Sequence, residues 1–127
     1  MNRLNFAFIC ERASVSDKDN ALEVRNPFSV VVAPNKPAIH KGASIVVNFM
    51  PGDTNKHSLG IKIKSPSKKE MIPPYRIDLG PAQNNKAGLG HILGIPQLTL
   101  DEEGDYIVEI EVDGKILHNI PFSFNLR

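Results

Sequence analysis

The closing stretch of the chain, residues 98–126, constrains the fold more than any other, because it has the pattern of a two-stranded hairpin. Mostly apolar residues occupy alternate positions in 106–112 and again in 116–126. Asp113-Gly114 separates the two runs, and this dipeptide is typical of a type I′ turn, which needs positive φ at both central residues. One face of the hairpin is therefore expected to be buried and the other wet. A lone hairpin is not stable, so the rest of the chain must supply a second sheet.

Six further segments have short apolar runs bounded by turn-forming residues, and none has a helical period. They span residues 3–12, 21–33 with a break at Asn26-Pro27, 42–50, 57–65, 72–79 and 88–95. This pattern predicts an all-β fold: an antiparallel, immunoglobulin- or fibronectin-like β-sandwich of about 7–9 strands, with Greek-key connections and little or no helix. The length of 127 residues predicts a single domain over 1–127.

Two segments have the character of sheet edges. In 57–65, apolar residues alternate with Gly60, Lys62 and Lys64, which predicts a half-exposed or edge strand. Pro27 cannot donate a hydrogen bond to a ladder, so the segment that it interrupts is also expected at an edge or a bulge. The lysines of 57–65, together with Lys68 and Lys69, are interpreted as a solvated face and not as a phosphate site.

Cys10 is the single cysteine, which excludes an internal disulfide and fits a reducing compartment. We expect it to be buried on the face shared by Leu4, Phe6 and Phe8, as a small hydrophobe rather than a reactive thiol. The apolar run 4–10 is too short for a membrane span and does not have the pattern of a secretory signal. The sequence therefore predicts a soluble, cytoplasmic protein with no membrane partner.

A more specific indication of the architecture lies at the start of the closing hairpin. Gly104-Asp105-Tyr106 begins the penultimate strand, as in the tyrosine corner of immunoglobulin-like domains, where the tyrosine hydroxyl bonds the backbone a few residues upstream. The chain has one cysteine and no tryptophan, so it lacks the disulfide and core tryptophan of antibody domains. Tyr106, Asp113 and Gly114 are the residues to which we assign structural roles.

Composition and motifs give no positive case for catalysis. A net charge of +1 removes the usual electrostatic argument for a nucleic-acid partner. There is no nucleophile elbow or dinucleotide fingerprint, so no catalytic residue and no cofactor are expected. The histidines lack the clustered spacing of zinc ligands and are interpreted as isolated; they are His40, His57, His91 and His118.

One polar turn has a weak metal-binding pattern. Asp17, Asp19 and Asn20 have the order of the first ligands of a calcium loop, but the glycine and the closing glutamate of an EF-hand are missing. Such residues are also the usual components of turns, and a turn is the favoured interpretation. A calcium site built from paired loops is the alternative.

The whole chain resembles a family of short bacterial proteins of unknown function. The matching motifs are Cys10-Glu11, Gly104-Asp105-Tyr106, Val112-Asp113-Gly114 and Ile120-Pro121-Phe122. The two ends match best and the middle matches by pattern. The resemblance implies a single-domain sandwich in the bacterial cytoplasm, and it implies no activity.

The first functional hypothesis is a non-enzymatic module that binds another protein, or a second copy of itself, through an edge strand. The alternative is a small-ligand or ion site, for calcium or a carbohydrate, in the loops at one end of the sandwich. Those loops are 17–20, 52–55 and 80–86. An enzyme with a dispersed site ranks last, because it would need a deep pocket with convergent polar groups.

Overall fold

The computed structural model describes residues 3–19, 21–52, 54–81 and 88–127. Within them the chain forms eleven strands and no helix, which confirms the all-β prediction. The strands are β1 (Leu4–Val15), β2 (Leu22–Pro27), β3 (Val30–Ala33), β4 (Ala38–His40), β5 (Ala43–Phe49), β6 (His57–Lys64), β7 (Tyr75–Leu79), β8 (Leu89–Ile95), β9 (Leu98–Leu100), β10 (Gly104–Val112) and β11 (Lys115–Leu126). The count exceeds the predicted 7–9, since β4 and β9 have three residues each and are too short to show an alternating pattern.

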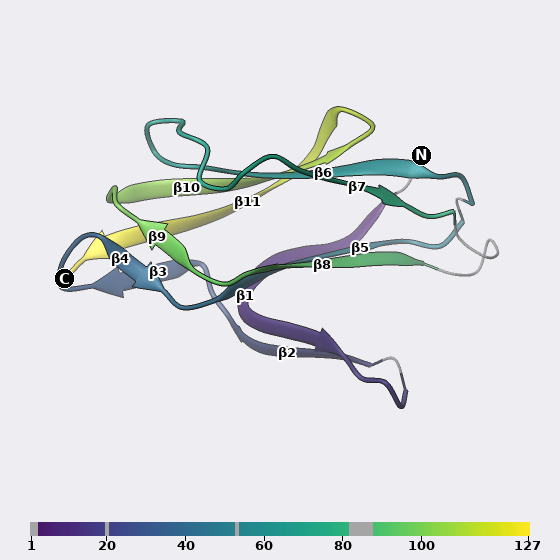
Figure 1. Ribbon diagram of the computed structural model, residues 1–127, viewed down its shortest axis with the longest axis horizontal. Helices are drawn as coiled ribbons and strands as arrows, with labels where there is room; N and C mark the ends of the chain where they lie inside the picture. Colours follow the sequence, from purple (N-terminus) through teal and green to yellow (C-terminus); the bar gives the residue numbers. More distant parts are fainter. Residues whose placement is uncertain (1–2, 20, 53, 82–87) are drawn as a thin grey trace.

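Two sheets face each other (Figure 1). The first has the strand order β2-β1-β5-β8 and the second has the order β3-β11-β10-β6-β7. A small two-stranded sheet, β4-β9, lies near one end of the sandwich. The strand pairs are antiparallel except for β3 and β11, which run parallel. Asn26-Pro27 does interrupt the second predicted segment, and its two halves, β2 and β3, lie at the edges of different sheets.

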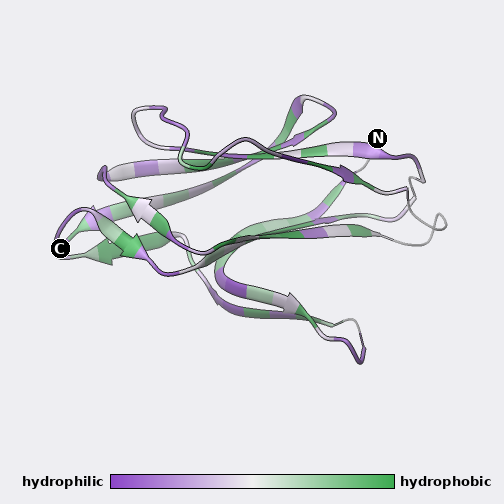
Figure 2. Cartoon of the chain, viewed as in Figure 1, coloured by the Kyte–Doolittle hydropathy of each residue, from purple (hydrophilic) through white to green (hydrophobic). Residues whose placement is uncertain are grey.

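The core fills the space between the two sheets. Alternate residues of the central strands point inward and are fully buried, while hydrophilic residues gather in the connections (Figure 2). Those with an exposed fraction of 1% or less include Ile45, Val47, Phe49, Leu59, Ile61, Ile63, Tyr106, Val108 and Ile110. Each side chain of this size stabilises the fold by about 1.5–3 kcal/mol through burial, so the central strands hold the sandwich together.

The closing hairpin has the predicted turn. Asp113 and Gly114 have φ of 53° and 83°, as a type I′ turn requires. The register shifts between Ile110 and Glu111, however, and a bulge of this kind bends and twists the strand pair. The turn end of the hairpin therefore leaves the core, and Ile116 and His118 are exposed although the alternation predicted them on the buried face.

Tyr106 makes the hydrogen bonds that the tyrosine-corner prediction required. Its hydroxyl donates to the carbonyl oxygen of Glu102 at 2.7 Å and accepts from the Glu102 amide at 3.1 Å. The ring is fully buried and stacks on Phe122 with 5.1 Å between centroids. Burial raises the pKa of the phenol above its ordinary value. Tyr106 thus fixes the turn before β10 to the core.

The facing of β1 differs from the prediction. A bulge at Asn5 shifts the register, so Ala7 and Ile9 face the core opposite Val47 and Ile45. The predicted inward face of Phe6, Phe8 and Cys10 is instead the outer face of the first sheet. Cys10 is nevertheless fully buried, as expected, and burial raises the pKa of its thiol.

Of the two alternatives predicted for residues 57–65, a half-exposed strand and an edge strand, the edge is wrong. β6 lies between β10 and β7. Its lysines do face outward, but Lys62 Nζ lies 3.4 Å from Glu111 Oε2, and Lys64 Nζ lies 3.3 Å from Glu109 Oε1, across the β6–β10 pair. A half-polar pattern is therefore compatible with a central strand whose outer face carries cross-strand ion pairs.

No helix within the described residues is long and apolar enough to cross a membrane.

Candidate functional site

The second half of β1 and all of β2 form an arm, defined here as the described residues of 11–27. The first half of β1 pairs with β5, and the second half leaves the sheet and pairs with β2 alone. Cys10 is the point of divergence, because it pairs with Ser44 on one side and Pro27 on the other. The arm then turns back and runs along the outer face of the first sheet (Figure 1).

A polar contact supports the base of the arm. Asn26 has a positive φ of 51°, a conformation that asparagine tolerates better than most residues. Its side-chain amide donates to Glu11 Oε2 at 3.0 Å. Pro27 follows and ends the ladder with β1. The sequence Asn26-Pro27 thus breaks the strand and directs the chain from one sheet to the other.

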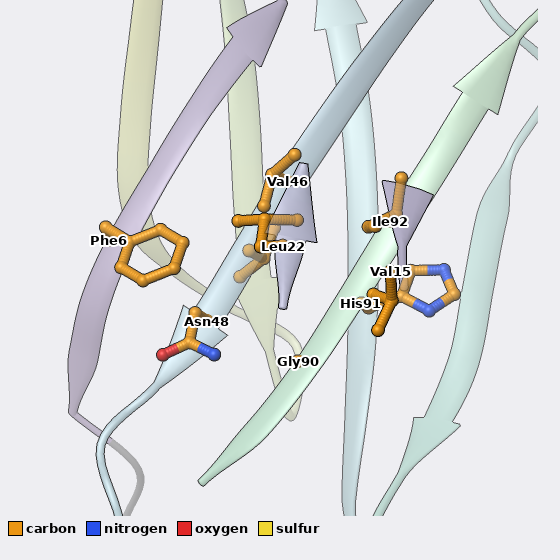
Figure 3. A pocket seen from close by; sticks show the side chains of 9 residues that line it. Phe6, Val15, Leu22, Val46, Asn48, Gly90, His91 and Ile92 are labelled. Atoms are coloured by element: carbon orange, nitrogen blue, oxygen red, sulfur yellow. The ribbon is translucent and has the colours of Figure 1, made fainter. Parts of the chain in front are cut away.

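An apolar groove of about 470 Å³ separates the arm from the sheet. Val15 and Leu22 of the arm form one wall, and Phe6, Val46 and Ile92 form the floor (Figure 3). Three of these side chains are substantially exposed: 37% for Phe6, 37% for Leu22 and 52% for Val15. Such a cluster of accessible apolar surface next to a concavity is typical of binding sites.

A polar group marks one end of this groove. The Asn48 side chain lies beside Phe6 at that end (Figure 3), and its Oδ1 accepts a hydrogen bond of 3.0 Å from Asn5 Nδ2. The groove is therefore lined mainly by apolar residues, with Asn48 at one end and His91 of β8 also in its lining.

Strand β8 borders the groove and is a free edge of the first sheet. One side of β8 pairs with β5 over its full length. Within the described ranges, no backbone hydrogen bond joins its other side to another element. Its sequence, Leu-Gly-His-Ile-Leu-Gly-Ile, contains no Lys, Arg, Asp, Glu or Pro.

The other three edges of the two large sheets carry features that discourage strand pairing. β2 contains Glu23, Arg25 and Pro27, and β7 contains Arg76 and Asp78. β3 is only four residues long. Charges, proline and short length each make an edge a poor template for another strand. β8 has seven residues and none of these protections.

His91, at the centre of β8, is held neutral. Its imidazole Nε2 is hydrogen-bonded to the hydroxyl of Tyr75 on β7, and the two rings stack. Burial lowers the pKa of His91 below its ordinary value of 6.5. The contact connects the edge strands of the two sheets and keeps β8 free of charge at neutral pH.

The remaining histidines lie on three different strands. His40 Nδ1 lies 2.7 Å from the Gly42 carbonyl and its ring stacks on Phe28, while His118 is exposed on β11. His57 Nδ1 lies 2.6 Å from Asp113 Oδ2. In the described part of the chain, no group of three or more His, Cys, Asp or Glu residues is placed to hold a metal ion.

The loops of the ligand hypothesis are only partly described. Asp19 Oδ1 accepts a hydrogen bond from the Ala21 amide at 3.1 Å. This hydrogen bond and a second one from the Ser16 hydroxyl lower the pKa of the Asp19 carboxyl. Asp17 and Asp19 are thus placed in a turn, while Asn20 lies outside the described residues. Asp53 and residues 82–87 lie outside them too, so the loop site stays a prediction.

Sequence patterns did not reveal the groove or the role of Asp113 beyond its turn. Asp113 Oδ1 also accepts from the Ser58 amide at 2.9 Å, which ties the hairpin turn to β6. The groove depends on the arm folding back, and no local pattern reports such a turn. One signal for the groove was available in the sequence. Val15 and Leu22 are apolar residues on either side of a polar turn, and the neighbouring sequence offers no apolar surface that would cover them.

Comparisons with known proteins give a family but no activity. The search of curated proteins found no match. Among solved structures, the chain is similar to "Pseudomonas fluorescens alkylpurine DNA glycosylase AlkC bound to DNA containing an abasic site analog", with a TM-score of 0.42 and 11% identity. That match covers 76% of this chain and 27% of the glycosylase chain, and a likeness at this level carries no functional argument. A family of unknown function (DUF6941) matches residues 5–125, and the chain therefore belongs to that family.

Proposed function

We propose that the protein is a non-enzymatic binding module that captures an extended segment of a partner protein on the free edge of β8. The observation that carries the proposal is the combination of an uncharged, proline-free edge strand with an apolar groove directly beside it. In strand addition, main-chain hydrogen bonds at a sheet edge supply affinity and side-chain pockets beside the edge supply specificity. β8 offers the main-chain groups for such hydrogen bonds, and the groove offers the side-chain pocket.

The shape of the site indicates the character of the segment. A strand paired with β8 would direct every second side chain toward the outer face of the first sheet. Gly90 has no side chain there, and Ile92 and Leu22 offer apolar contacts. The preferred segment should therefore carry apolar residues at alternate positions and no charge between them.

We also propose a bacterial, cytoplasmic setting and an immunoglobulin-like arrangement. The single cysteine, Cys10, is buried and forms no disulfide, as suits a reducing compartment. The strand order, with β5 between β1 and β8 and β10 between β6 and β11, is compatible with the immunoglobulin-like topology that the tyrosine corner suggested.

The proposal predicts that a charge on β8 weakens capture. Extended peptides would be selected on the purified protein from a random displayed library, and the affinity of a selected peptide measured by fluorescence anisotropy. Ile92→Lys puts an ammonium group into the groove beside the edge, and we expect it to weaken binding at least about tenfold, the effect of losing roughly 1.4 kcal/mol. Ile116→Lys, at an exposed site on β11, is the matched control and should bind like the unmodified protein.

Two results would contradict the proposal. One is a selected peptide that both variants bind with unchanged affinity, since binding would then lie elsewhere. The other is a stable dimer in light scattering that Ile92→Lys converts to a monomer, because the occupant of β8 would then be a second copy of the chain. A thermal melt of Ile92→Lys close to that of the unmodified protein would show that lost binding is not lost folding.

A further inference from the structure

A second depression, of about 480 Å³, lies on the outer face of the first sheet where the arm leaves it. Three cationic residues line it: Arg12 and Arg25 from the arm, and Lys41 from the turn before β5. Ser44 and Gly94, which are register partners on β5 and β8, also line it. These residues are far apart in sequence, and only the fold brings them together.

The three cations have no anionic partner within the part of the chain that the structure describes. No ion pair involves Arg12, Arg25 or Lys41 there. Glu11 is the one carboxylate lining the depression, and its Oε2 accepts a hydrogen bond from Asn26. The lining therefore has a formal excess of two positive charges, from three cations against one carboxylate.

This arrangement differs from the basic residues on the opposite sheet. There each of three lysines has a carboxylate 3.3–3.5 Å away; the pairs are Lys62 with Glu111, Lys64 with Glu109, and Lys69 with Asp101. The whole chain has a net charge of only +1. The unpaired cations at the arm are therefore a local concentration of charge and not a consequence of a basic composition.

The cross-strand register places two of these cations side by side. Arg12 and Arg25 lie directly opposite each other in the β1–β2 pair. Like charges at directly opposed positions destabilise a strand pair. A bound anion would remove that repulsion and gain charge-assisted hydrogen bonds from both guanidinium groups.

The depression also has space and a polar floor. A Cβ added at Gly94 would meet no atom within 4 Å, so the volume above this residue is open. Ser44 is 7% exposed and carries a hydroxyl that can donate. A guanidinium fork matches the geometry of phosphate oxygens, and a lysine ammonium serves as a compact point charge.

From these observations we propose that the depression is a phosphate-binding site. The ligand is a phosphate group, either free or carried by a small monoester, held by Arg12, Arg25 and Lys41 above Ser44 and Gly94. This site is separate from the apolar groove, and its assignment does not depend on the capture of a peptide by β8.

The test is a titration of the full chain followed by amide chemical shifts. Inorganic phosphate and glycerol phosphate would each be added at constant ionic strength set with chloride. We expect saturable shifts at Ser44, Gly94 and Arg25, and the tighter of the two probes would identify the source of the phosphate group. Chloride alone should produce no saturable shift at these amides.

Two variants locate the site. Arg25→Gln should weaken phosphate binding at least about tenfold, because it removes a charged donor of hydrogen bonds to the anion. Gly94→Glu keeps all three cations but supplies an internal carboxylate, and it should abolish binding. Lys115→Gln, which removes an exposed charge from the distant β10–β11 turn, is the matched control and should bind as before.

The proposal is overturned if neither phosphate probe gives shifts beyond those of chloride. It is also overturned if Arg25→Gln and Gly94→Glu, with melting temperatures showing that both are folded, bind phosphate as the unmodified protein does. In the absence of phosphate, the melting temperature of Arg25→Gln should equal or exceed that of the unmodified chain, since the variant relieves the repulsion between Arg12 and Arg25.

Discussion

At the scale of single residues, Tyr106 has the clearest structural role. Its buried hydroxyl both donates to and accepts from the backbone of Glu102, so the turn before β10 has a fixed position on the core. Removal of the hydroxyl leaves the backbone amide and carbonyl of Glu102 without these partners. Net contributions of about 0.5–1.5 kcal/mol per hydrogen bond are typical.

We predict that Tyr106→Phe lowers the free energy of unfolding by about 1–3 kcal/mol, because two hydrogen bonds in a part-buried site are lost. Urea unfolding followed by circular dichroism would measure the change. Tyr75→Phe is the matched control: its hydroxyl bonds a side chain at a half-buried site, so its effect should be smaller. An equal effect of the two substitutions would contradict the role assigned to Tyr106.

His91 predicts a pH dependence of stability. Burial lowers its folded-state pKa below 6.5, so the unfolded chain takes up the proton first as the pH falls. The contribution of neutral His91 to the free energy of unfolding is therefore fully present above about pH 6.5, and it is lost as the pH falls toward the lower pKa of the folded state. In urea titrations between pH 8 and pH 5, the free energy of unfolding should fall less with decreasing pH for His91→Gln than for the unmodified chain. Parallel curves would show that His91 does not titrate as described.

At the scale of elements, local patterns predicted strands well and their positions in the sheets less well. The closing hairpin followed from alternation and Asp113-Gly114, since both are local properties of the chain. The place of β6 did not, because Lys62 and Lys64 face outward whether the strand is central or at an edge. Their cross-strand partners, Glu109 and Glu111, come from β10 and cannot be assigned from the sequence of β6 alone.

The bulge at Asn5, near the start of the chain, is a second feature that local sequence patterns did not predict. One extra residue in a ladder reverses the facing of every residue beyond it. Phe6 and Phe8 therefore lie on the outer face, where Phe6 helps form the groove floor, although their alternation along the strand predicted burial. The candidate site was hidden for this reason, together with the backward turn of the arm at Cys10.

At the scale of the whole molecule, the two depressions to which we assign binding lie on the same side of the first sheet. Both lie between the arm and the outer face, and both are lined in part by β8: the apolar groove at Gly90 and Ile92, and the cationic depression at Gly94. The opposite sheet has paired charges on its outer face instead. The fold thus places the apolar groove and the cationic depression on the side that carries the free edge of β8.

The most direct measurement of the central claim is amide hydrogen exchange, residue by residue, with and without a peptide selected on the protein. An added strand would protect the edge amides of β8, so exchange within Leu89–Ile95 should slow at alternate residues while the amides of β2, β3 and β7 keep their rates. Protection at one of those other edges, or no change in β8 when the peptide is bound, would contradict the account.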